Sequence, residues 1–138
     1  MPTVLVVDDE ANLRLNMSAY LSDEGFDVHS VESGEDALSC VRSGNVIDVC
    51  IMDMRLPGMN GNETIRAMNQ LDKHIRYIVH TGTSGYNTPE DVRAIGITDN
   101  LVFAKPITDM NHLVITINEL ILHRSPAPDT EPTPGNTT

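Results

Sequence analysis

Residues 46–53 read VIDVCIMD, and residues 54–61 continue as MRLPGMNG. The first segment is apolar and rich in β-branched side chains, which predicts a strand buried on both faces. It ends on Asp53, and the Pro-Gly and Asn-Gly pairs that follow predict a sharp break in the chain. Open parallel sheets carry their chemistry at the carboxyl ends of their strands. Asp53 is therefore the first candidate site residue, and the other candidates are judged by whether they can reach it.

Similar short apolar segments flank this strand on both sides. They predict further strands at residues 3–7, 26–31, 75–80 and 101–104. Each strand is followed by a helical pattern, and the predicted helix starts carry capping or acidic residues at Asp8-Asp9-Glu10, Ser33-Gly34, Thr88-Pro89 and Thr108-Asp109. Strand and helix alternate five times, which predicts an α/β fold with a doubly wound, five-stranded parallel sheet and helices on both faces.

The length and composition of the chain limit the possible classes of protein. A chain of 138 residues suits one domain, which we assign to residues 1–124. Residues 125–138 are rich in proline and threonine and predict a disordered tail or a linker, so the protein either stands alone or is part of a longer chain. The sequence contains neither a bilayer-length apolar run nor a signal peptide, so we expect a cytoplasmic protein without membrane contact.

Charge and cysteine content exclude further classes. The net charge of −11 argues against direct nucleic-acid binding, and it suits carboxylates that gather around a cation. The two cysteines, Cys40 and Cys50, lack metal-ligand or redox spacing and are interpreted as buried small hydrophobic residues.

Several reactive side chains follow the predicted strands. Because the carboxyl ends of parallel strands share one edge of a sheet, we expect five residues to converge there. They are Asp8, Asp9, Asp53, Thr81 and Lys105. Clustered carboxylates repel one another unless a hard divalent cation lies among them, and Mg²⁺ is bound in proteins through few carboxylates, phosphate oxygens and water. One carboxylate can act as a nucleophile toward phosphorus, so the set predicts phosphoryl transfer with Mg²⁺.

The same residues carry a resemblance to a known family. Residues 3 to about 124 resemble the receiver domain of two-component response regulators, which has a flavodoxin-like (βα)5 fold. The matching motifs are Asp8-Asp9, Asp53 with the segment LPGMNG at 56–61, Thr81-Gly82 and Lys105-Pro106.

The resemblance implies a phosphorelay signalling phosphoprotein rather than an enzyme with an external substrate. Asp53 would accept the phosphoryl group from a histidine kinase or phosphotransfer protein and form an aspartyl phosphate. Asp8, Asp9, Asp53 and the backbone carbonyl of Arg55 would bind Mg²⁺, for which Mn²⁺ or Ca²⁺ could substitute. Thr81 and Lys105 would contact the phosphoryl group.

The resemblance also implies an output route. Phosphorylation would change the face made by the fourth helix, fifth strand and fifth helix, which is also a candidate homodimer face. An unknown downstream protein or output domain would read that change. The Lys105-Pro106 bond is expected to be cis.

Some positions differ from the family pattern or modify it. The family usually has Tyr or Phe three residues before the lysine, whereas this chain has Val102 there and Phe103 one residue later. Since a one-residue shift along a strand reverses the side-chain direction, Phe103 is either that ring in an altered register or a core residue. Gly82 leaves room for the phosphoryl group. Arg55 either modulates dephosphorylation or is a solvent-facing loop charge.

Simpler interpretations stand beside these. The acids at 8–10 could only start a helix, and Thr81 or Lys105 alone would be ordinary strand-end residues. Strand alternation points His80 away from the direction of Thr81, which predicts a packed or partly exposed histidine rather than a catalytic acid or base.

Three other functions are disfavoured. A receiver that works without phosphate is disfavoured because all the acceptor residues are present. A phosphatase with an aspartyl nucleophile is disfavoured because Arg55 occupies the place of its second acid. A flavin carrier is disfavoured because the loop after Val7 lacks Ser, Thr and Gly.

Overall fold

A five-stranded parallel sheet forms the centre of the protein. The computed structural model describes residues 1–82 and 86–122. The strand order is β2-β1-β3-β4-β5. The strands are β1 (Thr3–Val7), β2 (Asp27–Val31), β3 (Val49–Asp53), β4 (Arg76–Thr81) and β5 (Val102–Ala104). The predicted flavodoxin-like fold is thereby confirmed, whereas the predicted tail at 125–138 and part of the loop after β4 lie outside the described residues.

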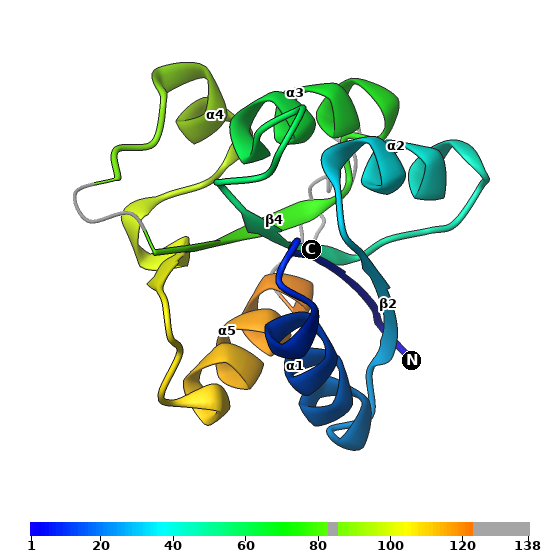
Figure 1. The fold of residues 1–138 in the computed structure, drawn as a ribbon, viewed down its shortest axis with the longest axis vertical. Coiled ribbons are helices and arrows are strands. Elements are labelled where there is room, and N and C mark those ends of the chain that lie inside the picture. The colour runs from blue at the N-terminus through cyan, green and yellow to red at the C-terminus, as the bar shows by residue number, and fades with distance from the viewer. Residues whose placement is uncertain (83–85, 123–138) are drawn as a thin grey trace, which may run out of the picture.

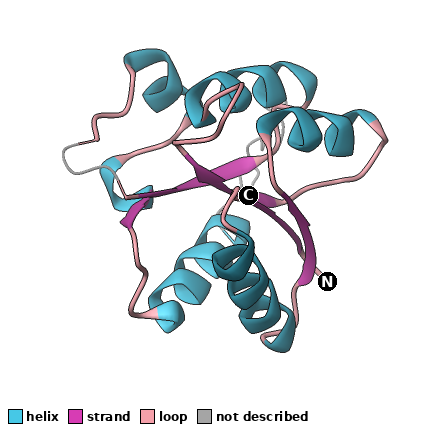
Figure 2. Cartoon of the chain, viewed as in Figure 1, coloured by secondary structure: helices cyan, strands magenta, loops and turns pink. Residues whose placement is uncertain are grey.

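Helices cover both faces of the sheet. They are α1 (Ala11–Asp23), α2 (Gly34–Arg42), α3 (Gly61–Leu71), α4 (Glu90–Ile95) and α5 (Met110–Leu122), with a short 3-10 turn, η1 (Asp99–Leu101), before β5. Helices α1 and α5 lie side by side on one face, and α2, α3 and α4 lie on the other (Figure 1). Figure 2 shows the strands as the middle of three layers. Within the described residues, no helix combines the length and hydropathy needed to cross a bilayer.

The core is built on the central strands. Every residue of β3 is buried, as is expected for a parallel strand covered on both faces. Helix α1 packs on the sheet through Met17 and Leu21, and α5 packs through Leu113 and Ile117, which recur at helical spacing along one face of each helix. Both cysteines are free thiols; Cys50 is buried as predicted, and Cys40 is half-buried.

Strand β3 begins later than predicted. Strand pairing starts with Val4 of β1 opposite Val49, so residues 46–48 lie outside the ladder. Val46 is 72% exposed, and the Asp48 Oδ2 atom accepts a hydrogen bond from the Thr3 backbone N–H at 2.8 Å. Composition alone predicted a longer strand because it does not show where the neighbouring strand begins.

The predicted helix starts are correct at α2 and α5 and wrong in detail at α1 and α4. Ser33 Oγ accepts the backbone N–H of Asp36, and Asp109 Oδ1 accepts that of His112. Helix α4 has Pro89 rather than Thr88 at its N-cap, without a side-chain cap hydrogen bond. The acids before α1 do not cap it through their side chains either: Glu10 is the N-cap residue and makes no side-chain cap hydrogen bond, and Asp8 Oδ1 accepts the backbone N–H of Glu10.

Candidate functional site

The predicted site residues meet at the carboxyl edge of the sheet. Asp8 follows β1, Asp53 ends β3, Thr81 ends β4, and Lys105 follows β5. The parallel order brings these four strand ends together, since β1, β3, β4 and β5 are successive neighbours in the sheet. Thr81 is 3% exposed and lies opposite Ala104, the residue before Lys105. The convergence expected from the sequence is therefore present.

Three carboxylates form what we call the acidic cluster: Asp8, Asp9 and Asp53. One oxygen of each lies within 4.8 Å of the others. Asp8 and Asp53 are buried, whereas Asp9 is exposed. Carboxylate oxygens at such spacing fit a hard divalent cation such as Mg²⁺, which prefers oxygen ligands.

Backbone hydrogen bonds orient two of these carboxylates. The N–H of Glu10 donates to Asp8 Oδ1 at 2.8 Å, and the N–H of Arg55 donates to Asp53 Oδ1 at 3.1 Å. Each bond spans two residues, which is the local turn that aspartate favours. The second carboxylate oxygens, the Oδ2 atoms, are thereby left to face Lys105.

Lys105 is the cation of the site. Its Nζ lies 2.9 Å from Asp8 Oδ2 and 3.3 Å from Asp53 Oδ2, and its side chain is 17% exposed. Burial alone would lower the pKa of Lys105, but the hydrogen bond to Asp8 and the negative charge of Asp53 outweigh burial and raise that pKa. The amine therefore stays charged and bridges the two buried carboxylates.

One lysine does not neutralise the cluster. Burial raises the pKa of Asp53, and the charge of Asp8 raises it further, against the lowering effect of the Arg55 N–H and Lys105. Holding Asp53 ionised thus costs free energy in the absence of a further positive charge. A bound divalent cation would remove that cost.

The loop after Asp53 is held by contacts that the sequence analysis did not identify. Glu35 of α2 accepts the backbone N–H of Met59 through Oε2 at 3.2 Å. A Cβ atom at Gly61 would lie 2.5 Å from the backbone oxygen of Asp53, so only glycine lets α3 start this close to the site. The Gly61 requirement and the Glu35 contact both depend on packing between elements, and neither has a local signature.

Two further groups were missed at the ends of α3 and α1. Asn60 and Glu63 form a reciprocal capping box at the start of α3. The Asn-x-x-Glu spacing could have revealed it. Arg14 donates through Nη1 to the backbone oxygen of Asp8 at 2.7 Å and ties α1 to the site.

The remaining predicted residues divide between the two sides of the sheet. Val79 pairs with Val102, and His80 pairs with Phe103, so Phe103 shares the side of His80. Phe103 is 8% exposed, and its ring centroid lies 5.1 Å from that of His112 on α5. It is therefore a core residue packed on α5, and Val102 keeps the place in which the family usually has an aromatic ring. His80 is buried, as strand alternation predicted.

Three other predicted positions lie around Lys105 and Asp53. The Lys105-Pro106 peptide bond is cis, as expected. Gly82 is exposed and has open space, since the nearest atom to a Cβ built there is Lys105 Cβ at 3.8 Å. Arg55 has an exposed side chain, while its backbone N–H contacts Asp53.

Comparison with known protein families and curated proteins gives a consistent result. A family model described as a response regulator receiver domain matches residues 4–118. The chain is 29% identical over 103 residues to sporulation initiation phosphotransferase F of Bacillus subtilis, covering 75% of this chain and 81% of that protein. It is 30% identical over 120 residues to the transcriptional regulatory protein ZraR of Escherichia coli, covering 87% of this chain but only 26% of ZraR.

Solved structures agree with these matches. Response regulator protein TrrA from Thermotoga maritima, in complex with Mg²⁺-BeF, is 30% identical and has a TM-score of 0.74. That alignment covers 87% of this chain and 99% of TrrA. A receiver domain protein from Clostridium thermocellum is 28% identical with a TM-score of 0.78, covering 88% of this chain and 95% of that one.

Proposed function

Because this chain belongs to the response regulator receiver domain family, we propose that Asp53 is the residue on which it accepts a phosphoryl group. The family consists of phosphoacceptor modules of two-component signalling rather than enzymes with external substrates. The observation that carries the assignment of Asp53 is its place in the acidic cluster. It is a buried carboxylate at a strand end, with Lys105 Nζ at 3.3 Å.

The proposed step is an exchange of one bond to phosphorus for another. A carboxylate oxygen of Asp53 forms a P–O bond while the P–N bond of a phosphohistidine donor breaks, and the leaving imidazole keeps the electron pair. The product is an acyl phosphate. Water later attacks its phosphorus, which restores the carboxylate and releases inorganic phosphate.

The other site residues are proposed to bind and neutralise the transferring group. Asp8, Asp9, Asp53 and the backbone carbonyl of Arg55 would hold Mg²⁺, or Mn²⁺ or Ca²⁺ in its place. When bound, the cation neutralises charge on the phosphoryl oxygens. Lys105 would exchange its contact with Asp53 for a phosphoryl oxygen, and the Thr81 hydroxyl would donate to another. The exposed residues Arg55 and Gly82 would border the approach to this group.

Receiver domains accept phosphoryl groups from histidine kinases and phosphotransfer proteins, and we propose a donor of that class. The output would follow from movement of Thr81 and Lys105 at the ends of β4 and β5. Since β5 is the edge strand, the face formed by α4, β5 and α5 is the proposed surface for a downstream partner or for a second copy of the chain.

A labelling experiment tests the assignment of Asp53. The protein is incubated with acetyl phosphate and Mg²⁺, and the phosphoryl adduct is measured by intact-protein mass spectrometry. We expect an adduct in the wild type and in Asp23→Asn, a matched control at the exposed end of α1, but none in Asp53→Asn. Chelation of Mg²⁺ should abolish labelling. Equal labelling of wild type and Asp53→Asn would reject the assignment.

A further inference from the structure

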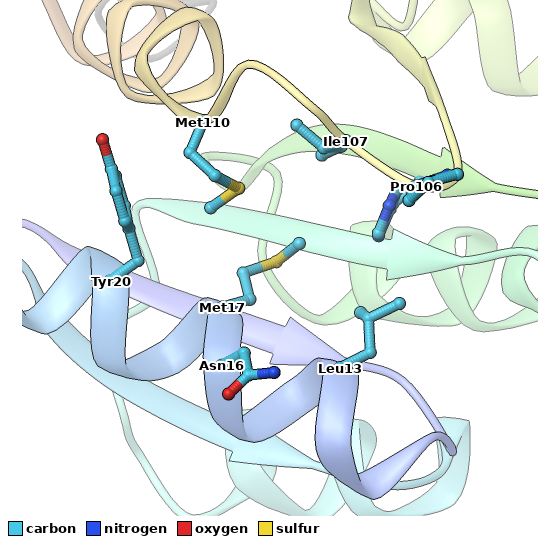
Figure 3. A pocket seen from close by; sticks show the side chains of 8 residues that line it. Leu13, Asn16, Met17, Tyr20, Pro106, Ile107 and Met110 are labelled. Carbon is cyan, nitrogen blue, oxygen red and sulfur yellow. The ribbon is translucent and has the colours of Figure 1, made fainter.

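A cavity of about 500 Å³ lies between α1 and the segment that joins β5 to α5. Its apolar lining comes from Leu13 and Met17 on α1 and from Pro106, Ile107 and Met110 after β5. Figure 3 shows Met17 and Met110 extending toward one another from opposite walls. Unbranched thioether side chains adapt their shape to a bound molecule more readily than branched ones. A mostly apolar cavity of this volume falls within the range of small-molecule sites.

Polar groups are few and differ in burial. Asn16 is exposed and Tyr20 is half-buried, so both belong to the rim of the cavity. His80 is 2% exposed and also lines the cavity. Its Nε2 is buried and has no hydrogen-bond partner among the residues that the structure describes. A buried polar atom in this state carries an uncompensated desolvation cost.

The imidazole of His80 offers a hydrogen-bonding atom, Nε2, at the wall of this cavity. A neutral imidazole nitrogen either donates or accepts one hydrogen bond, depending on the tautomer. The group that would satisfy Nε2 is therefore a single hydrogen-bond donor or acceptor on a bound molecule.

We propose that this cavity is a binding site for a small molecule with an apolar body and one hydrogen-bonding group, which pairs with His80 Nε2. The apolar walls would contact the body of the ligand, and the buried imidazole would fix its orientation. None of the three residues of the acidic cluster lines this cavity, and the proposal does not depend on phosphorylation of Asp53. Asn16 and Tyr20 would lie at its entrance.

Two probes of nearly equal shape test the proposal. In p-cresol, a hydroxyl group replaces one methyl group of p-xylene, and a hydroxyl can either donate to Nε2 or accept from it. The full chain is labelled with ¹³C at its methionine methyl groups, and each probe is titrated while the Met17 and Met110 signals are followed by NMR. We expect saturable shifts of these two signals with both probes.

Substitution of His80 separates the hydrogen bond from apolar contact. In His80→Leu the affinity for p-cresol relative to p-xylene should fall about tenfold, because one hydrogen bond to a buried group is lost. An unchanged ratio of the two affinities would overturn the proposal. So would the absence of saturable Met17 and Met110 shifts in the wild type.

A filled cavity gives an independent test, should His80→Leu fail to fold. Ile107 is half-buried in the loop between β5 and α5 and lines the cavity. The larger side chain in Ile107→Trp should fill the cavity and abolish the saturable shifts with both probes. The matched control Ile115→Trp changes a residue that is 46% exposed on α5 and should bind as the wild type does. Binding that survives in Ile107→Trp would place the probes elsewhere and overturn the proposal.

Discussion

Replacing Asp53 with asparagine should stabilise the protein when no divalent cation is present. The side chain keeps its shape but loses one negative charge from the acidic cluster. At a separation of up to 4.8 Å and an effective dielectric constant of about 20, each carboxylate pair repels by about 3 kcal/mol. Lys105, at 3.3 Å, attracts Asp53 by about 5 kcal/mol on the same basis. Because Asp9 is exposed and its charge is screened, the repulsion from the carboxylates and the attraction of Lys105 nearly cancel, and the burial of Asp53 leaves a net penalty of about 1 kcal/mol that Asp53→Asn relieves.

The stability that Asp53→Asn gains over the wild type should depend on pH in a defined direction. Burial and Asp8 raise the pKa of Asp53 above its unfolded value, so folding penalises the ionised form. The penalty is absent below the unfolded pKa of about 3.9, grows as the pH rises, and levels off above the raised folded pKa. The stability advantage of Asp53→Asn should therefore be full at pH 7 and disappear near pH 4.

Urea unfolding at pH 7, with EDTA or with Mg²⁺, measures both effects. We expect Asp53→Asn to exceed the wild type in EDTA by about 1 kcal/mol in unfolding free energy. The order should reverse at saturating Mg²⁺, since a ligand at a hundredfold its Kd stabilises the wild type by about 2.7 kcal/mol. The control Asp23→Asn should stay within about 0.5 kcal/mol of the wild type in both conditions. A loss of stability in Asp53→Asn in EDTA would refute the electrostatic reasoning.

Three further changes test other contacts by urea unfolding. Gly61→Ala should cost about 1–3 kcal/mol, because its Cβ would meet the Asp53 backbone oxygen at 2.5 Å, while Gly82→Ala should change stability by less than about 0.5 kcal/mol. Equal costs at the two glycines would contradict this account of the close approach of α3. Lys105→Met leaves Asp8 and Asp53 facing each other without a cation and should cost about 3 kcal/mol at pH 7. The cost should be smaller at pH 4, where carboxylates take up protons, and a cost independent of pH would argue against the ion pairs. Tyr77→Phe removes a buried hydroxyl that has no hydrogen-bond partner among the described residues, so stability should be unchanged or rise by up to about 1 kcal/mol. A large loss would reveal a partner for that hydroxyl.

The residues of the site show what a sequence pattern can predict about a tertiary arrangement. Asp8, Asp53, Thr81 and Lys105 were each assigned to the end of a predicted strand. One topological rule, that parallel strands share a carboxyl edge, then predicted their convergence. No side-chain geometry was needed, because strand ends in a five-stranded parallel sheet are only one or two strand spacings apart.

The sequence was less informative about where elements begin and which groups touch. It predicted a strand from residue 46, but the ladder starts at Val49 because pairing with β1 starts there. It left Phe103 with two interpretations, and the register beside His80, together with the contact with His112, assigns it to the core. Strand alternation fixes which residues share a side but not which side faces which helix.

The order of strands and helices, the buried central strand and the residues at the carboxyl edge of the sheet could be predicted, because hydrophobic period and turn chemistry are local properties of the chain. Three features are visible only in the folded chain: Lys105 bridges two carboxylates, Glu35 holds the loop after Asp53, and a cavity opens beside His80. Those features arise where segments far apart in the chain come within a few ångströms. Their distances depend on how the helices pack on the sheet, which no local pattern specifies.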